Sequence, residues 1–263
     1  MKLDLGQAWS DATALLSANK DVIGIVAGVF FFLPSLAFAL LLPDAAQPQI
    51  DPANSDAVME AMLAIYADNW WIFVLISVLQ MIGLLSLFAL LKDSARPTVS
   101  EALKRGATGL PSYIVAQIIT VIALGAIAGI LAVISPFLVF LAFPVVIYVM
   151  IKLSLVGPVI AVEQTLNPFT ALVRSWVLTK GNSLRIFAFF VLLFVIAIVI
   201  LLLITLIAGV ILAAVGGQIE LIGNGLVSSL LGAAMTAIYA AVLASIHRFL
   251  AGPDADALSK TFD

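Results

Sequence analysis

Long apolar runs alternate with short polar connections along this chain. Each run reaches the roughly 20 residues that an α-helix needs to cross a hydrocarbon layer of about 30 Å. Backbone polar groups find no water at that depth, so each run must pair them internally as a helix, and the alternation of a membrane β-barrel is not seen. We predict an all-α, polytopic membrane protein with six spanning helices, over 22–42, 70–91, 113–134, 136–162, 186–215 and 221–246.

A helix of another kind is predicted before the longest apolar run, over 167–180. Asn167 can cap the free amides of its first turn, and Pro168 suits the first helical position, which needs no amide hydrogen. Gly181 can adopt the left-handed conformation that ends a helix. Apolar residues recur at helical spacing, at Phe169, Leu172, Val173 and Trp176. We therefore expect an amphipathic helix on the inner membrane surface, with its basic residues near lipid phosphates.

The same arrangement recurs twice. An apolar stripe at the N-terminus precedes a stop at Asn19, and Thr98 and Glu101 have capping-box spacing ahead of 102–105 (ALKR), which is similar to 171–174 (ALVR) and precedes Gly106. The stripe consists of Leu5, Ala8, Trp9, Ala12, Leu15 and Leu16. These patterns predict one membrane domain, 1–263, with three amphipathic interfacial helices and three repeated units, each an interfacial helix plus a spanning hairpin: 1–91, 92–162 and 163–250, followed by a tail, 251–263.

Composition and charge fix the solvent and the orientation. Apolar residues make up 63 % of the chain, against roughly 45–50 % in water-soluble domains, which excludes that class. All twelve Lys and Arg residues fall on one side of the predicted membrane, whereas the connection 43–69 on the other side holds five acidic residues. The positive-inside rule then places both termini in the cytoplasm of a bacterial-type inner membrane. The acidic connection carries a further short helical pattern near 57–66.

Basic and polar residues near the inner surface are candidates for binding a lipid headgroup or another ligand. They are Lys152, Glu163, Arg174, Trp176, Lys180, Asn182 and Arg185, with Gly181 as a structural helix stop. Lys152 lies about 24 Å along the fourth helix, so it either extends to the inner interface or lines a cavity beneath Pro144 and Pro158. Glu163 can pair with Arg174 or Lys152, or be a solvated acid.

Small and amide residues indicate where helices meet. Glycines at four-residue spacing permit close backbone approach, which in lipid replaces the hydrophobic drive to associate. The candidates for helix packing are Gly24, Gly28, Gly125, Gly129 and Gly232, either inside one bundle or at a homodimer face. Gln80 and Gln117 are expected to form hydrogen bonds between helices rather than to select a solute.

Catalytic chemistry is scarce. His247 is the single histidine, expected to be solvated or interfacial beside Arg248, and the acidic residues fall almost entirely on the far side. The hydrogen-bonded set that a catalytic triad needs is therefore hard to assemble. There is no cysteine and no metal-ligand cluster or phosphate-binding loop. We expect no enzyme, no cofactor, no metal site and no nucleic-acid partner.

A motif near Glu163 resembles a known group of membrane domains. Asn167-Pro168, 171–176 (ALVRSW) and 178–182 (LTKGN) resemble the membrane domain of glycerophosphoryl diester phosphodiesterases and the related small YciC-like inner-membrane proteins. The resemblance implies a membrane domain without the activity, because the phosphodiesterase barrel of the fused relatives needs about 250 residues of alternating strands and helices. It directs attention to the candidate residues from Glu163 to Asn182.

Three functional hypotheses follow from the residues, and the third, an intramembrane enzyme, lacks a visible catalytic constellation. The first is a non-catalytic inner-membrane protein, an organiser or accessory subunit, that binds anionic phospholipid headgroups through its basic surface helices. The second is a transporter or flippase-like carrier of a lipid or small anionic metabolite, motivated by the prolines and Lys152 in the fourth helix. A homodimer or a partner membrane protein fits either of the first two hypotheses.

Overall fold

The computed structural model describes residues 2–42, 55–92, 98–135, 137 and 139–252, and the regular elements of these residues are all helices. The predictions that concern 43–54, Arg96 and most of the tail, 253–263, lie outside the described residues.

The six predicted spans are confirmed as helical segments long and apolar enough to cross a membrane, counted over the described residues. The first span is built from α2 (Lys20–Ala27), a π-helical turn η1 (Gly28–Phe32) and α3 (Leu33–Leu41). The others are α5 (Ser55–Leu90), α6 (Val99–Ile134), the pair α7 (Val139–Leu153) and α8 (Val156–Val162), α10 (Ser183–Val215) and α11 (Gly217–Ala251). Two shorter helices are α1 (Leu5–Ala18) and α9 (Pro168–Leu178).

The start and stop signals act as the sequence predicts. The Asn167 side chain accepts hydrogen bonds from the amides of Phe169 and Thr170, at 3.0 and 3.3 Å. Gly181 has φ +81°, the left-handed conformation expected of a helix stop. Thr98 and Glu101 form the predicted capping box.

The short helix predicted near 57–66 is confirmed as the first part of α5, and a kink at Asn69, where φ is −119° and ψ is 15°, separates it from the span predicted to begin at residue 70. One predicted boundary is wrong. The surface helix before Gly106 does not end there, because α6 runs without a break from Val99 to Ile134. Gly106 is held against the backbone of α5 near Ile82 and Ser86, so its missing side chain serves packing rather than helix termination.

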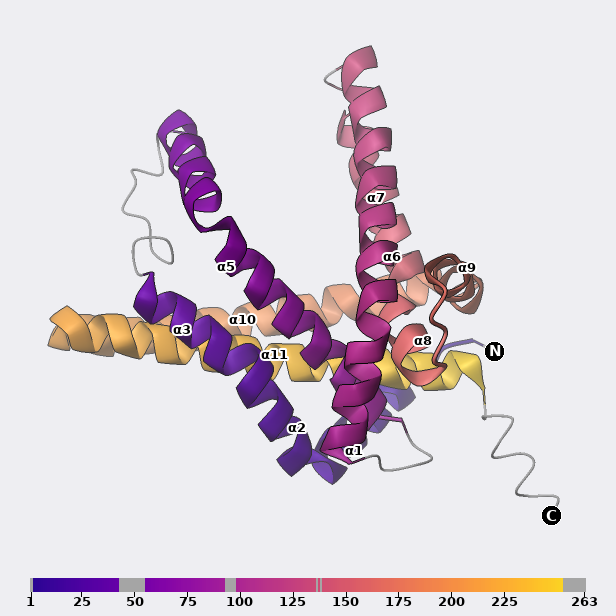
Figure 1. Cartoon of the computed structure of the whole chain (residues 1–263), viewed down its shortest axis with the longest axis horizontal. Coiled ribbons are helices and arrows are strands. Elements are labelled where there is room, and N and C mark those ends of the chain that lie inside the picture. Colours follow the sequence, from indigo (N-terminus) through magenta and orange to yellow (C-terminus); the bar gives the residue numbers. More distant parts are fainter. Residues whose placement is uncertain (1, 43–54, 93–97, 136, 138, 253–263) are drawn as a thin grey trace.

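The buried core lies at one end of the molecule, where α1, α8 and α9 gather (Figure 1). We call this region the basic end, because Lys152, Arg174, Lys180 and Arg185 lie on or next to α8 and α9. From there α5, α6 with α7, and α10 with α11 diverge in different directions (Figure 1). In α10 only Ile186 and Phe189 are buried, and both lie in its first two turns. The long outer stretch of α10 exposes an almost continuous apolar surface, as expected of a helix solvated by lipid.

The glycines predicted to pack inside the bundle do not do so. A Cβ atom added to Gly24, Gly28, Gly125, Gly129 or Gly232 would meet nothing within 4 Å, because these residues lie on open faces of the diverging helices. Other glycines make the close approaches: Gly83 faces Phe30, Gly109 faces Ile160 and Gly157 faces Phe88. The homodimer face stays a prediction.

The expected bonds between helices from the two glutamines are also not formed. Gln117 donates to the hydroxyl of Tyr113, one turn earlier on the same helix, at 2.9 Å. The side chain of Gln80 has no hydrogen-bond partner among the residues that the structure describes.

Candidate functional site

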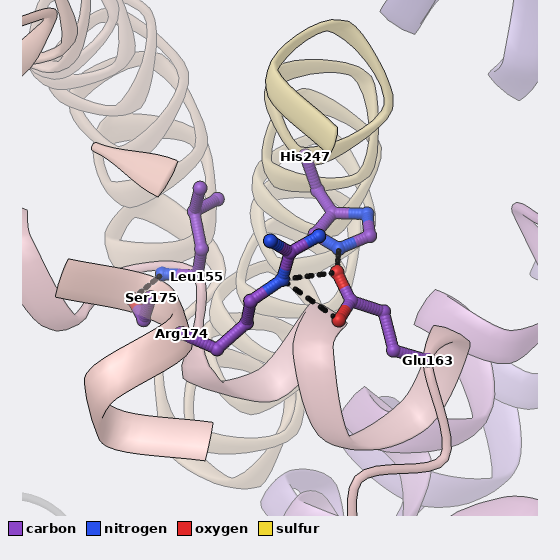
Figure 2. Close-up of polar contacts among 5 residues, drawn as sticks. All are labelled: Leu155, Glu163, Arg174, Ser175 and His247. Atoms are coloured by element: carbon purple, nitrogen blue, oxygen red, sulfur yellow. Dashed lines mark hydrogen bonds and ion pairs between the residues drawn. The ribbon is translucent and has the colours of Figure 1, made fainter. Parts of the chain in front are cut away.

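A break between α7 and α8 organises the basic end. The fourth span is interrupted at Ser154 and Leu155, which leaves backbone groups without their usual helical partners. Ser175 of α9 satisfies two of them, since its hydroxyl donates to the Lys152 carbonyl at 2.8 Å and accepts from the Leu155 amide at 3.2 Å (Figure 2 shows the second bond). Helix α9 therefore holds the broken span together through a buried serine.

The same break places Lys152 beside α9. Its side chain is 3 % exposed, and its Nζ atom lies 5.7 Å from the ring centre of Tyr148 and 5.4 Å from that of Trp176. Both rings present their electron-rich faces to the ammonium group, a favourable cation–π arrangement. No carboxylate pairs with Lys152 among the described residues. Lys152 is thus buried against two aromatic rings, and its two expected positions, at the inner interface or on a cavity wall, stay predictions.

An apolar groove begins next to this cage. It lies between α7 and the start of α10, encloses about 460 Å³, and shares Tyr148 with the Lys152 cage. Pro144 and Phe187 form part of its walls, and Ser183 and Leu184 at the start of α10 also line it. Lys180 is exposed just before α10 and is near enough to Lys152 for their charges to repel. A positively charged end and an apolar channel therefore adjoin each other.

A second cluster joins three helices through Glu163, which follows the last residue of α8. Its carboxylate accepts from Nε of Arg174 at 3.0 and 3.3 Å, and lies 3.0 Å from Nε2 of His247 on α11 (Figure 2). Partial burial by itself raises the pKa of Glu163, but the hydrogen bonds and charges of His247 and Arg174 outweigh it, so the pKa is lowered. The predicted pair of Glu163 with Arg174 is confirmed, and the alternative pair with Lys152 does not form.

The expectation that His247 is solvated is wrong, and its expected place at the membrane interface stays a prediction. The residue is 4 % exposed, and its Nε2 atom carries the hydrogen, because an ionised carboxylate only accepts. One acid does reach this histidine, because α8 brings Glu163 to the basic end. No hydroxyl is bonded to His247 within the described part of the chain, so the pair lacks the nucleophile of a triad.

Two of the candidate ligand residues hold the N-terminus instead. Asn182 is buried, and its side-chain oxygen accepts from the Leu3 amide at 2.8 Å. Arg185 donates to the Leu3 carbonyl at 2.9 Å. Both backbone groups of one residue are thereby held at the α9–α10 junction, next to α1, whose buried stripe packs on α11. These contacts give Asn182 and Arg185 a structural role.

We expect Asn182→Ala to free the segment before α1. The Leu3 amide loses a buried hydrogen bond worth about 1 kcal/mol, or roughly a fivefold change in local opening. Amide hydrogen exchange over residues 3–8 should accelerate by about that factor. Asn224→Ala on α11 is the matched control, since its side chain makes no hydrogen bond to described residues. Equal exchange in the two variants would contradict the role of Asn182.

The candidate residues divide into three groups. Lys152, Trp176 and Lys180 lie near one another beside the groove, and Glu163 and Arg174 form the ion pair. Asn182 and Arg185 bind the N-terminal backbone, with Gly181 as the turn between α9 and α10. Sequence reasoning missed Tyr148, although it lies one helical turn before Lys152 and so shares its face. It also missed the role of Ser175, because the prolines of the fourth helix favour a break but do not say which side chain bonds to the backbone there.

Together these features define the class of the protein: within its described residues, an α-helical chain with six segments long and apolar enough to span a membrane, and a polar cluster at one end. A scan against protein families, a search of curated proteins and a search of solved structures found no match. The resemblance to phosphodiesterase membrane domains and YciC-like proteins therefore stays a prediction.

Proposed function

We propose that this protein is a non-catalytic inner-membrane protein that binds an anionic phospholipid at its basic end, with that end in the cytoplasm. The observation that carries the proposal is Lys152, a buried cation with no carboxylate partner among the described residues, beside an apolar groove. A buried charge is costly unless it is paired, and a lipid phosphate supplies the missing anion. Lys180 adds a second positive charge at the same end.

The groove supports a lipid, rather than a free anion, as the source of the phosphate. Its walls are almost entirely apolar, from Phe143 to Ile151 on α7 and from Ser183 to Phe187 on α10. A free phosphate or a small anionic metabolite gains nothing from such walls, whereas an acyl chain buries apolar surface there. With the phosphate at Lys152 and Lys180, the chain extends along α7 and α10 toward the membrane centre.

Helix α9 supports the same placement. It packs on the bundle through Ala171, Ser175 and Leu178, while Phe169, Val173 and Trp176 are exposed. Large exposed apolar residues beside basic ones are typical of a helix lying in the membrane interface. Helix α9 thus has two roles in this proposal: it bonds to the backbone of the broken span, and its exposed face contacts lipid headgroups.

The test is lipid binding by the double variant Lys152→Met/Lys180→Gln. Each basic residue near anionic lipid contributes about 1 kcal/mol, so we expect affinity for phosphatidylglycerol to fall roughly thirtyfold. Native mass spectrometry of the protein with its own lipids, followed by titration with phosphatidylglycerol, measures the loss. Methionine matches the length of lysine and needs no counterion, so the variant should remain folded.

The matched control is Lys20→Gln/Lys104→Gln, which removes two exposed positive charges from the same end but away from the groove. Phosphatidylcholine provides the neutral lipid for comparison. Equal losses in the two double variants would mean that only the overall positive charge matters and would contradict a defined site.

The break between α7 and α8 favours a carrier as the second candidate, because discontinuous spans often build substrate sites in transporters. Flux of a fluorescent phospholipid between the leaflets of proteoliposomes tests it. A carrier requires flux that falls in Lys152→Met, whereas binding without flux leaves the accessory role.

A further inference from the structure

A polar cavity lies inside the membrane-spanning part of the fold, away from the basic cluster. It encloses about 390 Å³ between the first span, α5, α6 and α11. Seven of its lining residues carry hydrogen-bonding side chains: Ser35, Ser77, Gln80, Tyr113, Gln117, Thr236 and Tyr239. This volume is within the usual range for small-molecule sites, roughly 300–1,000 Å³.

The depth of the cavity makes its polarity notable. Gln80 of α5 lies twelve residues before Lys92, which corresponds to about 18 Å along a helix. Tyr239 of α11 lies nine residues before Arg248, or about 14 Å. Both positions fall near the middle of a hydrocarbon layer of about 30 Å. Amide and hydroxyl groups at that depth are costly unless they find partners.

Few of these groups have partners within the protein. Gln117 bonds to Tyr113, but no hydrogen bond reaches the side chains of Ser35, Ser77 or Gln80 from the described residues. Donors and acceptors are both left free, because an amide offers NH₂ and C=O and a hydroxyl offers both functions. None of the described residues that line the cavity is charged. Its free groups therefore match an uncharged partner that both donates and accepts.

The first span is built irregularly where it borders the cavity. In η1 the amide of Leu33 donates to the carbonyl of Gly28, five residues earlier, and this π-turn carries Phe31 into the cavity wall. Single π-helical turns within α-helices occur frequently at functional sites. The turn and the unpaired polar groups are independent observations at one place.

We propose that this cavity binds the hydroxyl group of an uncharged membrane lipid, such as a diacylglycerol. Ser77, Gln117 and Tyr239 are exposed at the surface of the spanning region, so the cavity opens sideways at hydrocarbon depth. A lipid reaches that opening by diffusing in the membrane, whereas a free polyol must first leave water. The hydroxyl then bonds to Gln80 and Ser77, and Met81 and Leu84 contact the apolar part.

A steric variant tests the site without disturbing the packing of the fold. Gly232 lines the cavity, and a Cβ added there meets nothing within 4 Å, so Gly232→Leu is expected to fold and to obstruct the cavity. Gly209→Leu on α10 is the matched control, since Gly209 is equally open and lies outside the cavity. The full chain is placed in phosphatidylcholine nanodiscs with a photoreactive diacylglycerol, and cross-linking is quantified.

We expect cross-linking to fall at least tenfold in Gly232→Leu and to stay unchanged in Gly209→Leu. Gln80→Leu should lower it about fivefold, the effect of one hydrogen bond, while Gln218→Leu at the outer end should not. Equal labelling of the two glycine variants would overturn the site. Competition by glycerol in the aqueous phase, with none by unlabelled diacylglycerol, would overturn the lipid and assign a free polyol to the cavity.

Discussion

Gly106→Ala is expected to destabilise the fold by about 2 kcal/mol, because one added carbon overpacks the contact between α6 and α5. The new Cβ would lie 2.9 Å from the Ile82 carbonyl oxygen and 3.0 Å from the Ser86 amide nitrogen. Both are backbone atoms, so the strain cannot be relieved by rotating a side chain. Ser86 is itself fully buried and bonded to Ile82, so the helices must move apart.

Gly129→Ala on the same helix supplies the control. A Cβ at Gly129 meets nothing within 4 Å, and alanine favours a helix by about 1 kcal/mol over glycine, so this variant should be slightly more stable. Unfolding in mixed micelles with increasing dodecyl sulfate, followed by circular dichroism, compares the two. If both substitutions stabilise the protein, α5 and α6 do not approach as closely as the structure places them.

These two glycines also show what the sequence could reveal. The spans follow from long apolar runs alone, because hydropathy responds to membrane thickness and not to neighbours. The spacing of glycines also favours close packing, yet Gly125 and Gly129 face open space while Gly106 and Gly109 are in contact. Four-residue glycine spacing predicts a helix face without side chains, but it does not predict which face packs against another helix. Tertiary contacts determine which face does so.

The candidate site was also predictable only in part, because some of its contacts depend on tertiary packing. Glu163 and Arg174 lie eleven residues apart, so their pairing follows from a short chain reversal before α9. His247 is 84 residues from Glu163 and joins the cluster only through the packing of α11 beside α8. The cage of Lys152 similarly needs Trp176 from α9. Local partners were visible in the sequence, and distant ones required the assembled fold.

The three repeated units stay a prediction, and the similar packing of two short segments of the chain favours them. The similar segments 102–105 and 171–174 begin with Ala102 and Ala171, and both alanines are fully buried. The residues that follow the segments, Gly106 and Ser175, are also both in contact with another helix. Equivalent positions thus serve equivalent packing, even though one segment continues into its span and the other ends at Gly181.

Glu163→Gln is expected to lower stability by about 2 kcal/mol, because the carboxylate is the common acceptor for Arg174 and His247. A glutamine retains the shape but offers one oxygen, and its NH₂ group faces donors. Arg174 is 40 % exposed on its side chain, so water screens part of its pairing, and the larger loss comes from the buried histidine. Arg174→Gln should therefore cost less than Glu163→Gln.

The contribution of Glu163 to stability depends on pH. The pKa of Glu163 is lowered in the folded state, so folding favours the ionised form, and this contribution is complete above the unfolded value of about 4.3. It is lost as the pH falls through the lower folded pKa. Wild type should thus become less stable below about pH 4, and Glu163→Gln should lose less stability over that interval.

Thermal unfolding in detergent between pH 3 and pH 7 measures both effects, with Glu220→Gln as the control at the opposite end of the molecule. Glu220 has no ion pair with the described residues, so its variant should follow the wild-type curve. If Glu163→Gln also follows that curve, the carboxylate does not hold α8, α9 and α11 together. If only the acid part is unchanged, another carboxyl group governs the pH dependence, and the role of Glu163 rests on its hydrogen bonds alone.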